Sequence, residues 1–294
     1  MRRIYILALA LLCALPSVMA QQTISYEGAD ETVRLWDNST AKYSNYETRD
    51  EAWNNKRKTS MKQTSSCELY IFKAKPEKNT GIAVAIYPGG GYTRLNLNVS
   101  MAKWYAENGI TAAIVKYRTP NFGHTEAIME DAAGAVRYLR TRTDLGIDPA
   151  KIGVTGSSAG GHLSAWVSNA MADDEKPAFA IPIYPWIDLT ISSSNTEGKA
   201  LFQTLGKDYT IQDAADLSLH TKVGPTTPPT LIFLCHDDSI VLSLSSTKYY
   251  EALARHGVKA SMHIFPRGGH SMKLHTEEQR AATLDWLNWL GLLK

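Results

Sequence analysis

Cysteine, net charge and long hydrophobic runs are all scarce in this sequence of 294 residues. Three cysteines are too few for a disulfide scaffold, and no C-x-x-C pair indicates a zinc site. The 31 basic side chains nearly balance the 29 acidic ones, so nucleic acid is not expected as a partner. The 20 glycines and 12 prolines follow no repeat, which excludes a collagen-like or low-complexity chain. What remains is the composition of an ordinary globular protein, with 44% hydrophobic residues.

The most apolar stretch lies at the start of the chain. Residues 4–15 carry no charged side chain, follow Arg2 and Arg3, and are themselves followed by small residues before Gln21. At 1.5 Å per residue this run spans about 18 Å, well short of the roughly 30 Å hydrocarbon core of a bilayer. We therefore predict a signal peptide over residues 1–20. The mature protein would be exported, periplasmic or secreted, with no membrane anchor after signal removal.

Short apolar runs alternate with helical patterns along most of the chain. Helices are expected around residues 128–139, before residues 108 and 256, and from Thr276, where Gln279 has capping-box spacing. This alternation predicts an α/β fold with a mostly parallel sheet covered by helices on both faces. The expected strands are 68–72, 82–87, 111–117, 152–155, 179–184, 231–235 and 262–265.

Two segments fall outside this alternation. Residues 21–66 are polar with scattered aromatic side chains and no clear period, so we expect an irregular N-terminal extension that wraps the main domain. The interval of about 187–229 has no obvious strand, which is typical of a lid or binding loop. The predicted organisation is a signal peptide, the extension, and one α/β domain over 67–294 that carries this insertion.

The strongest chemical signal is the pattern G-x-S-x-G at residues 156–160. It stands between an expected strand and an expected helix, the setting in which this pattern holds a nucleophilic serine on a strained turn. A side chain at Gly156 or Gly160 would collide with neighbouring strands or the helix. Ser158 is therefore predicted to be the nucleophile, exposed at the carboxyl edge of the sheet.

A serine nucleophile needs a base, and that base needs an orienting acid. His270 follows an expected strand after two glycines, which suit a loop that crosses the sheet edge, so we predict that it is the base. Asp237 and Asp238 both stand at the end of the expected strand 231–235. Asp238 is favoured because its spacing to Val241 matches the usual acid loop, and Asp237 remains the alternative.

A glycine-rich loop follows the expected strand 82–87. Backbone N–H groups there can approach a developing oxyanion because no side chain blocks them. The predicted oxyanion donors are Gly90, Gly91 and Ala159, which follows the nucleophile. A phosphate-binding loop is disfavoured, since no G-x-G-x-x-G or Walker pattern is present. Tyr92 and Trp186 are weaker candidates for substrate contact, and Trp186 fits the core equally well.

Four segments in this order resemble the α/β-hydrolase superfamily: IYPGGGY at 86–92, GSSAGGH at 156–162, DDSIV at 237–241 and PRGGH at 266–270. Within it they look most like secreted bacterial carbohydrate esterases, such as acetyl-xylan and feruloyl esterases. The resemblance covers roughly residues 68–294. It implies a serine esterase that removes acetyl or feruloyl groups from plant polysaccharides or oligosaccharides through an acyl-enzyme, without a metal or cofactor. Pro88 departs from the family, which often has a supporting His there.

Two other functions and one pairing stay open. A serine peptidase of the prolyl-oligopeptidase type shares the catalytic order, although such enzymes usually carry a large β-propeller ahead of the hydrolase domain. A hydrolase-like binding protein without activity would generally lack a triad member, and here all three positions are filled. Cys67 and Cys235 could form a disulfide, but a buried free thiol is equally consistent with the sequence. His162 is expected to pack or to form hydrogen bonds on the helix after the nucleophile.

Overall fold

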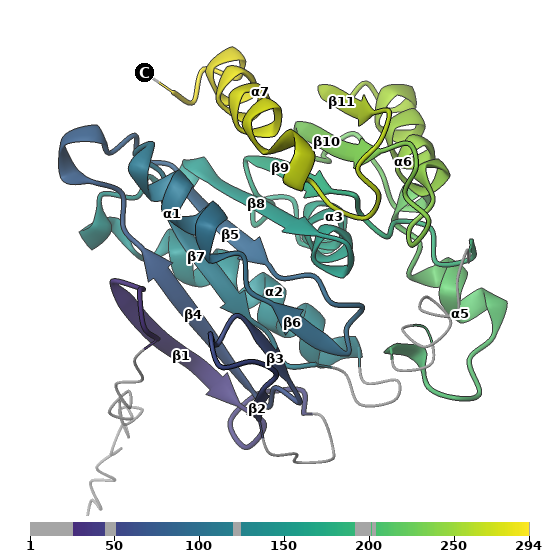
Figure 1. Cartoon of the computed structure of the whole chain (residues 1–294), viewed down its shortest axis with the longest axis horizontal. Coiled ribbons are helices and arrows are strands. Elements are labelled where there is room, and N and C mark those ends of the chain that lie inside the picture. The colour runs from purple at the N-terminus through teal and green to yellow at the C-terminus, as the bar shows by residue number, and fades with distance from the viewer. Residues whose placement is uncertain (1–25, 45–50, 120–124, 192–200, 202–203, 294) are drawn as a thin grey trace, which may run out of the picture.

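An eight-stranded sheet forms the centre of the molecule (Figure 1). The structure, a computed structural model, describes residues 26–44, 51–119, 125–191, 201 and 204–293, so the predicted signal peptide lies outside the described residues. The strand order is β1-β4-β7-β5-β8-β9-β10-β11, and only β4 runs antiparallel to both of its neighbours. These strands are β1 (Glu31–Asp37), β4 (Ser66–Phe72), β5 (Ala83–Tyr87), β7 (Thr111–Lys116), β8 (Ile152–Ser157), β9 (Phe179–Ile183), β10 (Thr230–Cys235) and β11 (Ala260–Phe265).

Helices cover both faces of this sheet. In Figure 1, α1 and α7 lie in front of the sheet, whereas α2 and α3 lie behind it. Helix α6 packs with α3 in a separate apolar cluster behind β10. The α-helices that lie within the described residues are α1 (Val99–Glu107), α2 (Thr125–Arg140), α3 (Ala159–Ala170), α5 (Ile211–Asp216), α6 (Ser243–Arg255) and α7 (Thr276–Trp289).

The central strands are the elements that the sequence predicts best. Every residue of β5, β7, β8, β9 and β10 is buried. Strands covered on both faces become continuous apolar runs rather than alternating ones, which makes them easy to recognise. The edge strand β11 is only partly buried, yet its apolar residues still mark it. The predicted strand ends differ from the observed ones by at most two residues.

The N-terminal extension is more regular than predicted, which corrects the expectation for residues 21–66. Strand β1 pairs with β4 and extends the main sheet, so the extension is not separate from it. A second small sheet contains β2 (Ala52–Trp53), β3 (Ser60–Lys62) and β6 (Arg94–Asn96). The sequence signal was weak because β1 is an edge strand with only Val33 buried.

A buried ionic network fastens the extension to the rest of the domain. The Trp36 indole N–H donates to Asp131 Oδ1 at 2.5 Å, and Arg118 Nη2 contacts the same carboxylate at 2.7 Å. Arg118 also donates to the backbone carbonyl of Tyr43 and to Glu130 Oε2. Both Arg118 and Asp131 are fully buried, so the paired charges compensate for the desolvation of each other.

The insertion between β9 and β10 carries α5, and its described residues form no strand. Residues 192–200 and 202–203 of it lie outside the described ranges. Its start is anchored to α6, because the Ser245 hydroxyl accepts the backbone N–H groups of Ile187 and Asp188, both at 2.9 Å. Asp188 also forms an ion pair of 2.6 Å with Lys248. Asp188 is therefore a structural anchor of the insertion.

Two further expectations are settled by the fold. Cys67 and Cys235 are free thiols, since they lie on β4 and β10, five strand steps apart or about 24 Å. A disulfide needs Cα atoms within about 7 Å. The predicted capping box at the start of α7 does not form: the Thr276 hydroxyl donates back to the carbonyl of Met272 at 3.0 Å instead. The N-cap residue of α7 is His275, so Thr276 lies one position inside the helix and cannot cap it.

Candidate active site

Ser158 occupies a sharp turn between β8 and α3. Its backbone has φ 58° and ψ −120°, a conformation that L-residues rarely adopt. The turn is possible only because its neighbours are glycines: a Cβ on Gly160 would lie 1.9 Å from the carbonyl oxygen of Tyr87, and one on Gly156 2.3 Å from the carbonyl oxygen of Gly160. The side chain of Ser158 is thus held at the carboxyl edge of the parallel strands, as the sequence predicts.

The structure brings Ser158, His270 and Asp238 into one line of hydrogen bonds. His270 Nε2 is 2.8 Å from Ser158 Oγ, and His270 Nδ1 is 2.6 Å from Asp238 Oδ2. A carboxylate only accepts, so Nδ1 must carry the proton in this pair. Nε2 of the neutral ring then has a free lone pair for the serine hydroxyl. This is the protonation state that a general base for Ser158 requires.

The two neighbouring aspartates have different partners. The other oxygen of Asp238, Oδ1, accepts the backbone N–H groups of Ile240 at 2.9 Å and Val241 at 3.0 Å. Residues 238–241 therefore form a turn that the Asp238 carboxylate closes, which accounts for the spacing between Asp238 and Val241. Asp237 instead accepts the N–H groups of Gly268 at 3.2 Å and Gly269 at 2.8 Å. Asp237 thus positions the loop that carries His270, and neither of these hydrogen bonds goes to the imidazole.

The charge of Asp237 is stabilised by the same loop. Mainly through the backbone N–H of Gly269, the pKa of Asp237 is lowered from its ordinary value. The carboxylate therefore stays ionised and keeps accepting both glycine N–H groups at neutral pH. Gly268 and Gly269 have φ values of 146° and 61°, which explains why two glycines precede His270.

The predicted oxyanion donors have no competing acceptors. No described residue accepts a hydrogen bond from the backbone N–H of Gly90, Gly91 or Ala159. Gly90 has φ 137°, and a Cβ there would lie 2.2 Å from the carbonyl oxygen of Arg94. Ala159 is the first residue of α3, where helix N–H groups lack intrahelical acceptors. These three N–H groups remain available to a ligand at this end of the sheet.

The glycine loop has its own supports despite Pro88. The hydroxyl of Tyr117 donates to the carbonyl oxygen of Pro88 at 2.8 Å. The backbone N–H of Asn96 donates to the carbonyl oxygen of Gly89, also at 2.8 Å. These two bonds fix the loop from the sheet and from β6. They account for the loop scaffolding that the departure at Pro88 leaves unexplained in the sequence.

Tyr92 does not line an open site, which corrects its expected role in substrate contact. Its side chain is fully buried, and its hydroxyl lies 2.6 Å from His162 Nδ1 and 3.0 Å from the carbonyl oxygen of Ala159. His162 Nε2 lies 2.8 Å from the carbonyl oxygen of Leu217 in the insertion. Tyr92 and His162 therefore join the glycine loop, the nucleophile helix and the insertion beneath the site.

Burial decides the charge of this histidine. It lowers the pKa of His162 to about 4, so the imidazole is neutral at pH 7. The carbonyl of Leu217 can only accept, which places the single ring proton on Nε2. Nδ1 then accepts from the Tyr92 hydroxyl. His162 is confirmed as a hydrogen-bonding residue of α3.

Trp186 and Tyr184 complete the surroundings of the triad. Trp186 is 3% exposed, so its side chain belongs to the core, and its role in substrate contact is not supported. Its backbone N–H donates to the carbonyl oxygen of Ser158 at 3.3 Å and so helps to hold the turn. The Tyr184 ring lies 4.5 Å from the His270 ring, centroid to centroid. Sequence reasoning missed Tyr184, although its position at the carboxyl end of β9 is a usable signal.

Metal-binding clusters and membrane-spanning helices are both absent from the described residues. No group of three His, Cys, Asp or Glu side chains there could hold a metal ion. Within the same ranges, no helix has the length and hydrophobicity needed to cross a bilayer.

Comparisons with known proteins agree with this architecture. A family model described as the alpha/beta hydrolase fold matches residues 86–274. An acetylxylan esterase of Xylanibacter ruminicola is 30% identical over 215 residues, which are 68% of this chain and 43% of that protein. The endo-1,4-beta-xylanase B of Butyrivibrio fibrisolvens is 26% identical over 210 residues, 66% of this chain and 33% of that protein. The chain thus spans less than half the length of these two relatives.

One solved structure is similar over most of its length. It is an acetyl ester-xyloside bifunctional hydrolase from Caldicellulosiruptor lactoaceticus, with a TM-score of 0.69 and 29% sequence identity. The similarity covers 78% of this chain and 90% of that chain.

Proposed function

The chain belongs to the alpha/beta hydrolase fold family, and from this premise we propose that it is a serine esterase that removes acetyl groups from xylan-like substrates. Membership confirms the predicted fold class and the predicted class of enzyme, a hydrolase. The observation that carries the finer proposal is the hydrogen-bonded line from Ser158 through His270 to Asp238, at 2.8 and 2.6 Å. The names of the relatives favour acetyl esters of xylan over feruloyl esters.

The proposed reaction proceeds through an acetyl-enzyme. His270 Nε2 takes the proton of Ser158 as its oxygen attacks the ester carbonyl carbon. The negative charge that develops on the carbonyl oxygen accepts N–H bonds from Ala159 and the glycine loop. When the intermediate collapses, His270 returns the proton to the leaving sugar oxygen. Water then repeats the attack on acetyl-Ser158 with His270 as base, and acetate is released.

The proposal is tested by replacing Ser158 with alanine and measuring turnover of an aryl acetate and of acetylated xylan. We expect turnover to fall by about 10⁶, to the level left by binding and the oxyanion donors alone. An unchanged circular dichroism spectrum and melting temperature would serve as the control for folding. Undiminished turnover in Ser158→Ala would refute the assignment.

A substrate panel separates the related activities. Acetylated xylan, a feruloylated sugar, an aryl acetate and a prolyl peptide are compared at equal enzyme concentration. We expect the highest kcat/KM on acetylated sugars and no cleavage of the prolyl peptide. Cleavage of the peptide alone would instead indicate a peptidase, and no turnover at all would indicate a binding protein.

We also propose that the protein is exported. The support is the basic and then apolar pattern of residues 1–20. The experiment is to express the full chain in a bacterial host and to determine the N-terminal sequence of the protein found outside the cytoplasm. A mature chain that begins at Gln21 is expected, whereas an uncleaved chain retained in the cytoplasm would contradict export.

A further inference from the structure

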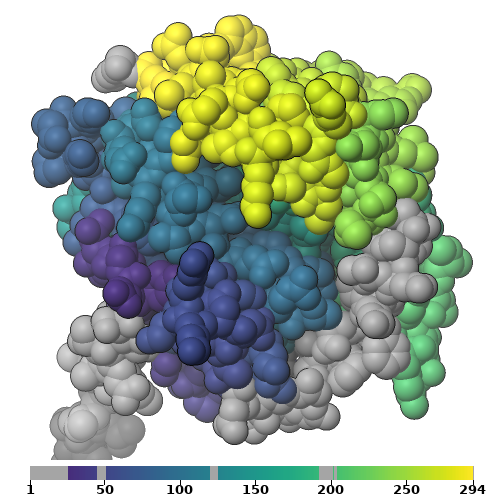
Figure 2. Space-filling model, viewed as in Figure 1, coloured from purple at the N-terminus to yellow at the C-terminus, as the bar shows by residue number. Residues whose placement is uncertain are grey.

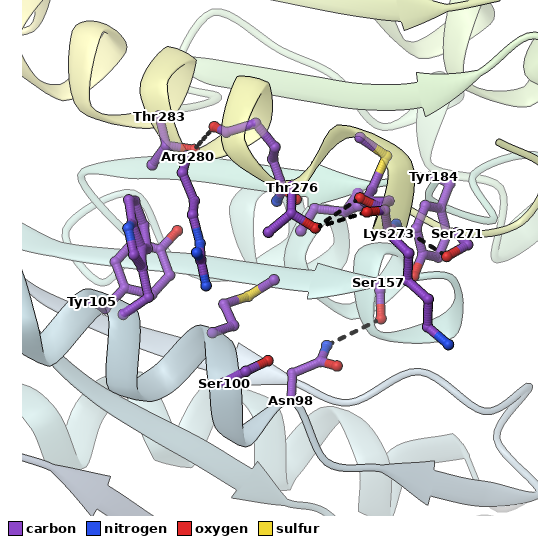
Figure 3. Close-up of a pocket in the computed structure, with 15 residues that line it drawn as sticks. Asn98, Ser100, Tyr105, Ser157, Tyr184, Ser271, Lys273, Thr276, Arg280 and Thr283 are labelled. Atoms are coloured by element: carbon purple, nitrogen blue, oxygen red, sulfur yellow. Dashed lines mark hydrogen bonds between the residues drawn. The ribbon is translucent and has the colours of Figure 1, made fainter. Parts of the chain in front are cut away.

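A cavity of about 240 Å³ lies between α1 and α7, next to the catalytic residues (Figure 3). Its lining includes Ser157 and Ser271, which flank Ser158 and His270 in the chain, and also Tyr184, which contacts the His270 ring. In the space-filling view the surface is hollowed where the yellow C-terminal segment meets the segment that contains α1 (Figure 2). The mechanism proposed above does not use this cavity.

All charged side chains that line the described part of the cavity are positive. Among its described lining residues, Lys273 and Arg280 are cationic and none is acidic. Arg280 projects from α7 toward α1, whereas Lys273 extends past Ser157 on the opposite side of the view (Figure 3). Arg280 Nη1 pairs with Glu277 at 2.9 Å, but Glu277 is 81% exposed, so this pair is weak and screened. The Nε and Nη2 donors of Arg280 and the ammonium of Lys273 have no acceptor among the described residues.

Neutral donors line the same space without full partners. Gln279 as a whole residue is only 9% exposed, and its side-chain amide forms no hydrogen bond to a described residue. The amide is absent from the buried side-chain atoms that lack a partner, so it is open to the cavity and can bond to a molecule there. Asn98 precedes α1 without capping it, and its amide makes only a long contact of 3.4 Å with Ser157 Oγ. The cavity therefore offers hydrogen bonds as well as positive charge.

One wall of the cavity is apolar. Met101, Trp104 and Tyr105 from α1 line it, and the Arg280 guanidinium lies 5.6 Å from the Trp104 ring centroid. Aromatic faces beside hydroxyl and amide groups suit the apolar face and polar edge of a sugar ring. The volume is below the roughly 300–1,000 Å³ of pockets for drug-sized ligands, so it suits one ring rather than an oligosaccharide.

We propose that this cavity is a subsite for a carboxylate-bearing sugar, a hexuronic acid residue of the polysaccharide that carries the scissile ester. The guanidinium of Arg280 would bind the carboxylate in place of Glu277, since its planar donors match two carboxylate oxygens. Lys273 adds a second positive charge, and the amides of Gln279 and Asn98 bind ring hydroxyls. This inference rests on the proposed esterase function and specifies which substrates it prefers.

The first test compares two acetylated xylo-oligosaccharides of equal length, one neutral and one bearing a single uronic acid. We expect the acidic substrate to have a KM about tenfold lower, at the low end for a charge-assisted contact because Arg280 is partly exposed. In Arg280→Gln the ratio of the two KM values should fall toward one. Arg255→Gln, which removes an exposed cation from α6, is the matched control and should keep the ratio of the wild type.

The second test measures binding without turnover. Isothermal calorimetry on Ser158→Ala is performed with glucuronic acid, glucose, acetate and inorganic phosphate. We expect binding of glucuronic acid that weakens about tenfold in the double variant Ser158→Ala/Arg280→Gln. Equal binding of all anions, or of glucose and glucuronic acid, would overturn the subsite.

The two proposals fail in different ways. If aryl acetates are hydrolysed but the neutral and acidic oligosaccharides have the same KM in the wild type, the subsite is refuted and the esterase stands. If no ester is hydrolysed, the esterase is refuted, and the calorimetric comparison of glucuronic acid with glucose alone decides the subsite.

Discussion

The exchange of Asp238 for asparagine should nearly abolish activity while leaving the fold intact. Asp238 Oδ1 accepts two backbone N–H groups, from Ile240 and Val241, and Oδ2 accepts from His270 Nδ1. In Asp238→Asn the only carbonyl oxygen of the new amide must serve those two N–H donors, because leaving them unpaired is costly, above all for the buried N–H of Val241. The amide NH₂ would then face His270 Nδ1, which must become the acceptor.

The consequence is a wrong tautomer of the base. With Nδ1 as acceptor, the ring proton moves to Nε2, the atom 2.8 Å from Ser158 Oγ. The serine hydroxyl then has no lone pair to receive its proton. The same change in a well-studied serine protease lowers kcat about 10⁴-fold. At about 1.4 kcal/mol per tenfold, this corresponds to about 5.5 kcal/mol of lost transition-state stabilisation.

Asp237→Asn is the matched comparison, because it removes the same charge one residue away. Its oxygens contact only the N–H groups of Gly268 and Gly269, and an amide oxygen can still accept from one of them. We expect kcat/KM on an aryl acetate to fall less than about tenfold, the worth of one exposed hydrogen bond. If Asp237→Asn were the more damaging variant, or if Asp238→Asn kept more than about a tenth of the activity, the assignment of the acid would be refuted.

Three further predictions concern the support of the site. Because burial lowers the pKa of His162 to about 4 from 6.5, the unfolded chain binds more protons below pH 6.5, and stability falls as the pH falls from 6.5 toward 4. In urea unfolding, the free energy of unfolding should decrease between pH 7 and pH 4.5 by about 2–3 kcal/mol more in the wild type than in His162→Gln. Equal decreases in the two proteins would contradict this. Gly160→Ala should unfold the protein or displace the turn that carries Ser158, since the new Cβ would lie 1.9 Å from the Tyr87 carbonyl oxygen. In the control Gly224→Ala the new Cβ would have no atom within 4 Å, so this variant should keep the melting temperature of the wild type. Tyr92→Phe should lower the free energy of unfolding by about 1–3 kcal/mol, because His162 Nδ1 loses its donor. The control in the denaturant titration is Tyr250→Phe, because the Tyr250 hydroxyl bonds to no described residue. Equal decreases in the two variants would be evidence against the role of Tyr92.

The parts of the fold that could be predicted are those whose burial leaves a local pattern. Strands β5 and β7 are covered on both faces and therefore form uninterrupted apolar runs. Strand β1 was missed because it depends on pairing with β4 and on the contact of Trp36 with Asp131, which lies 95 residues away. No local pattern of residues 31–37 reports such a partner.

The site shows the same division. Ser158 and His270 are marked by glycines that local backbone geometry requires, and Asp238 by the turn it closes with Val241. The loop glycines beside Tyr92 suggest substrate contact, but its side chain is buried and bonds to His162 on another element, which no local pattern reveals. The cavity between α1 and α7 was not foreseen, since its walls meet only in the folded chain.

The most direct test of the central claim is the site of covalent labelling by a fluorophosphonate, which reacts with an activated serine. The protein is labelled at pH 7 and digested, and the modified peptide is sequenced by mass spectrometry to separate Ser158 from its neighbour Ser157. We predict one label per chain on Ser158, and none in Ser158→Ala or after denaturation. A label on Ser157, or no label on the folded protein, would contradict a serine hydrolase built on Ser158, His270 and Asp238.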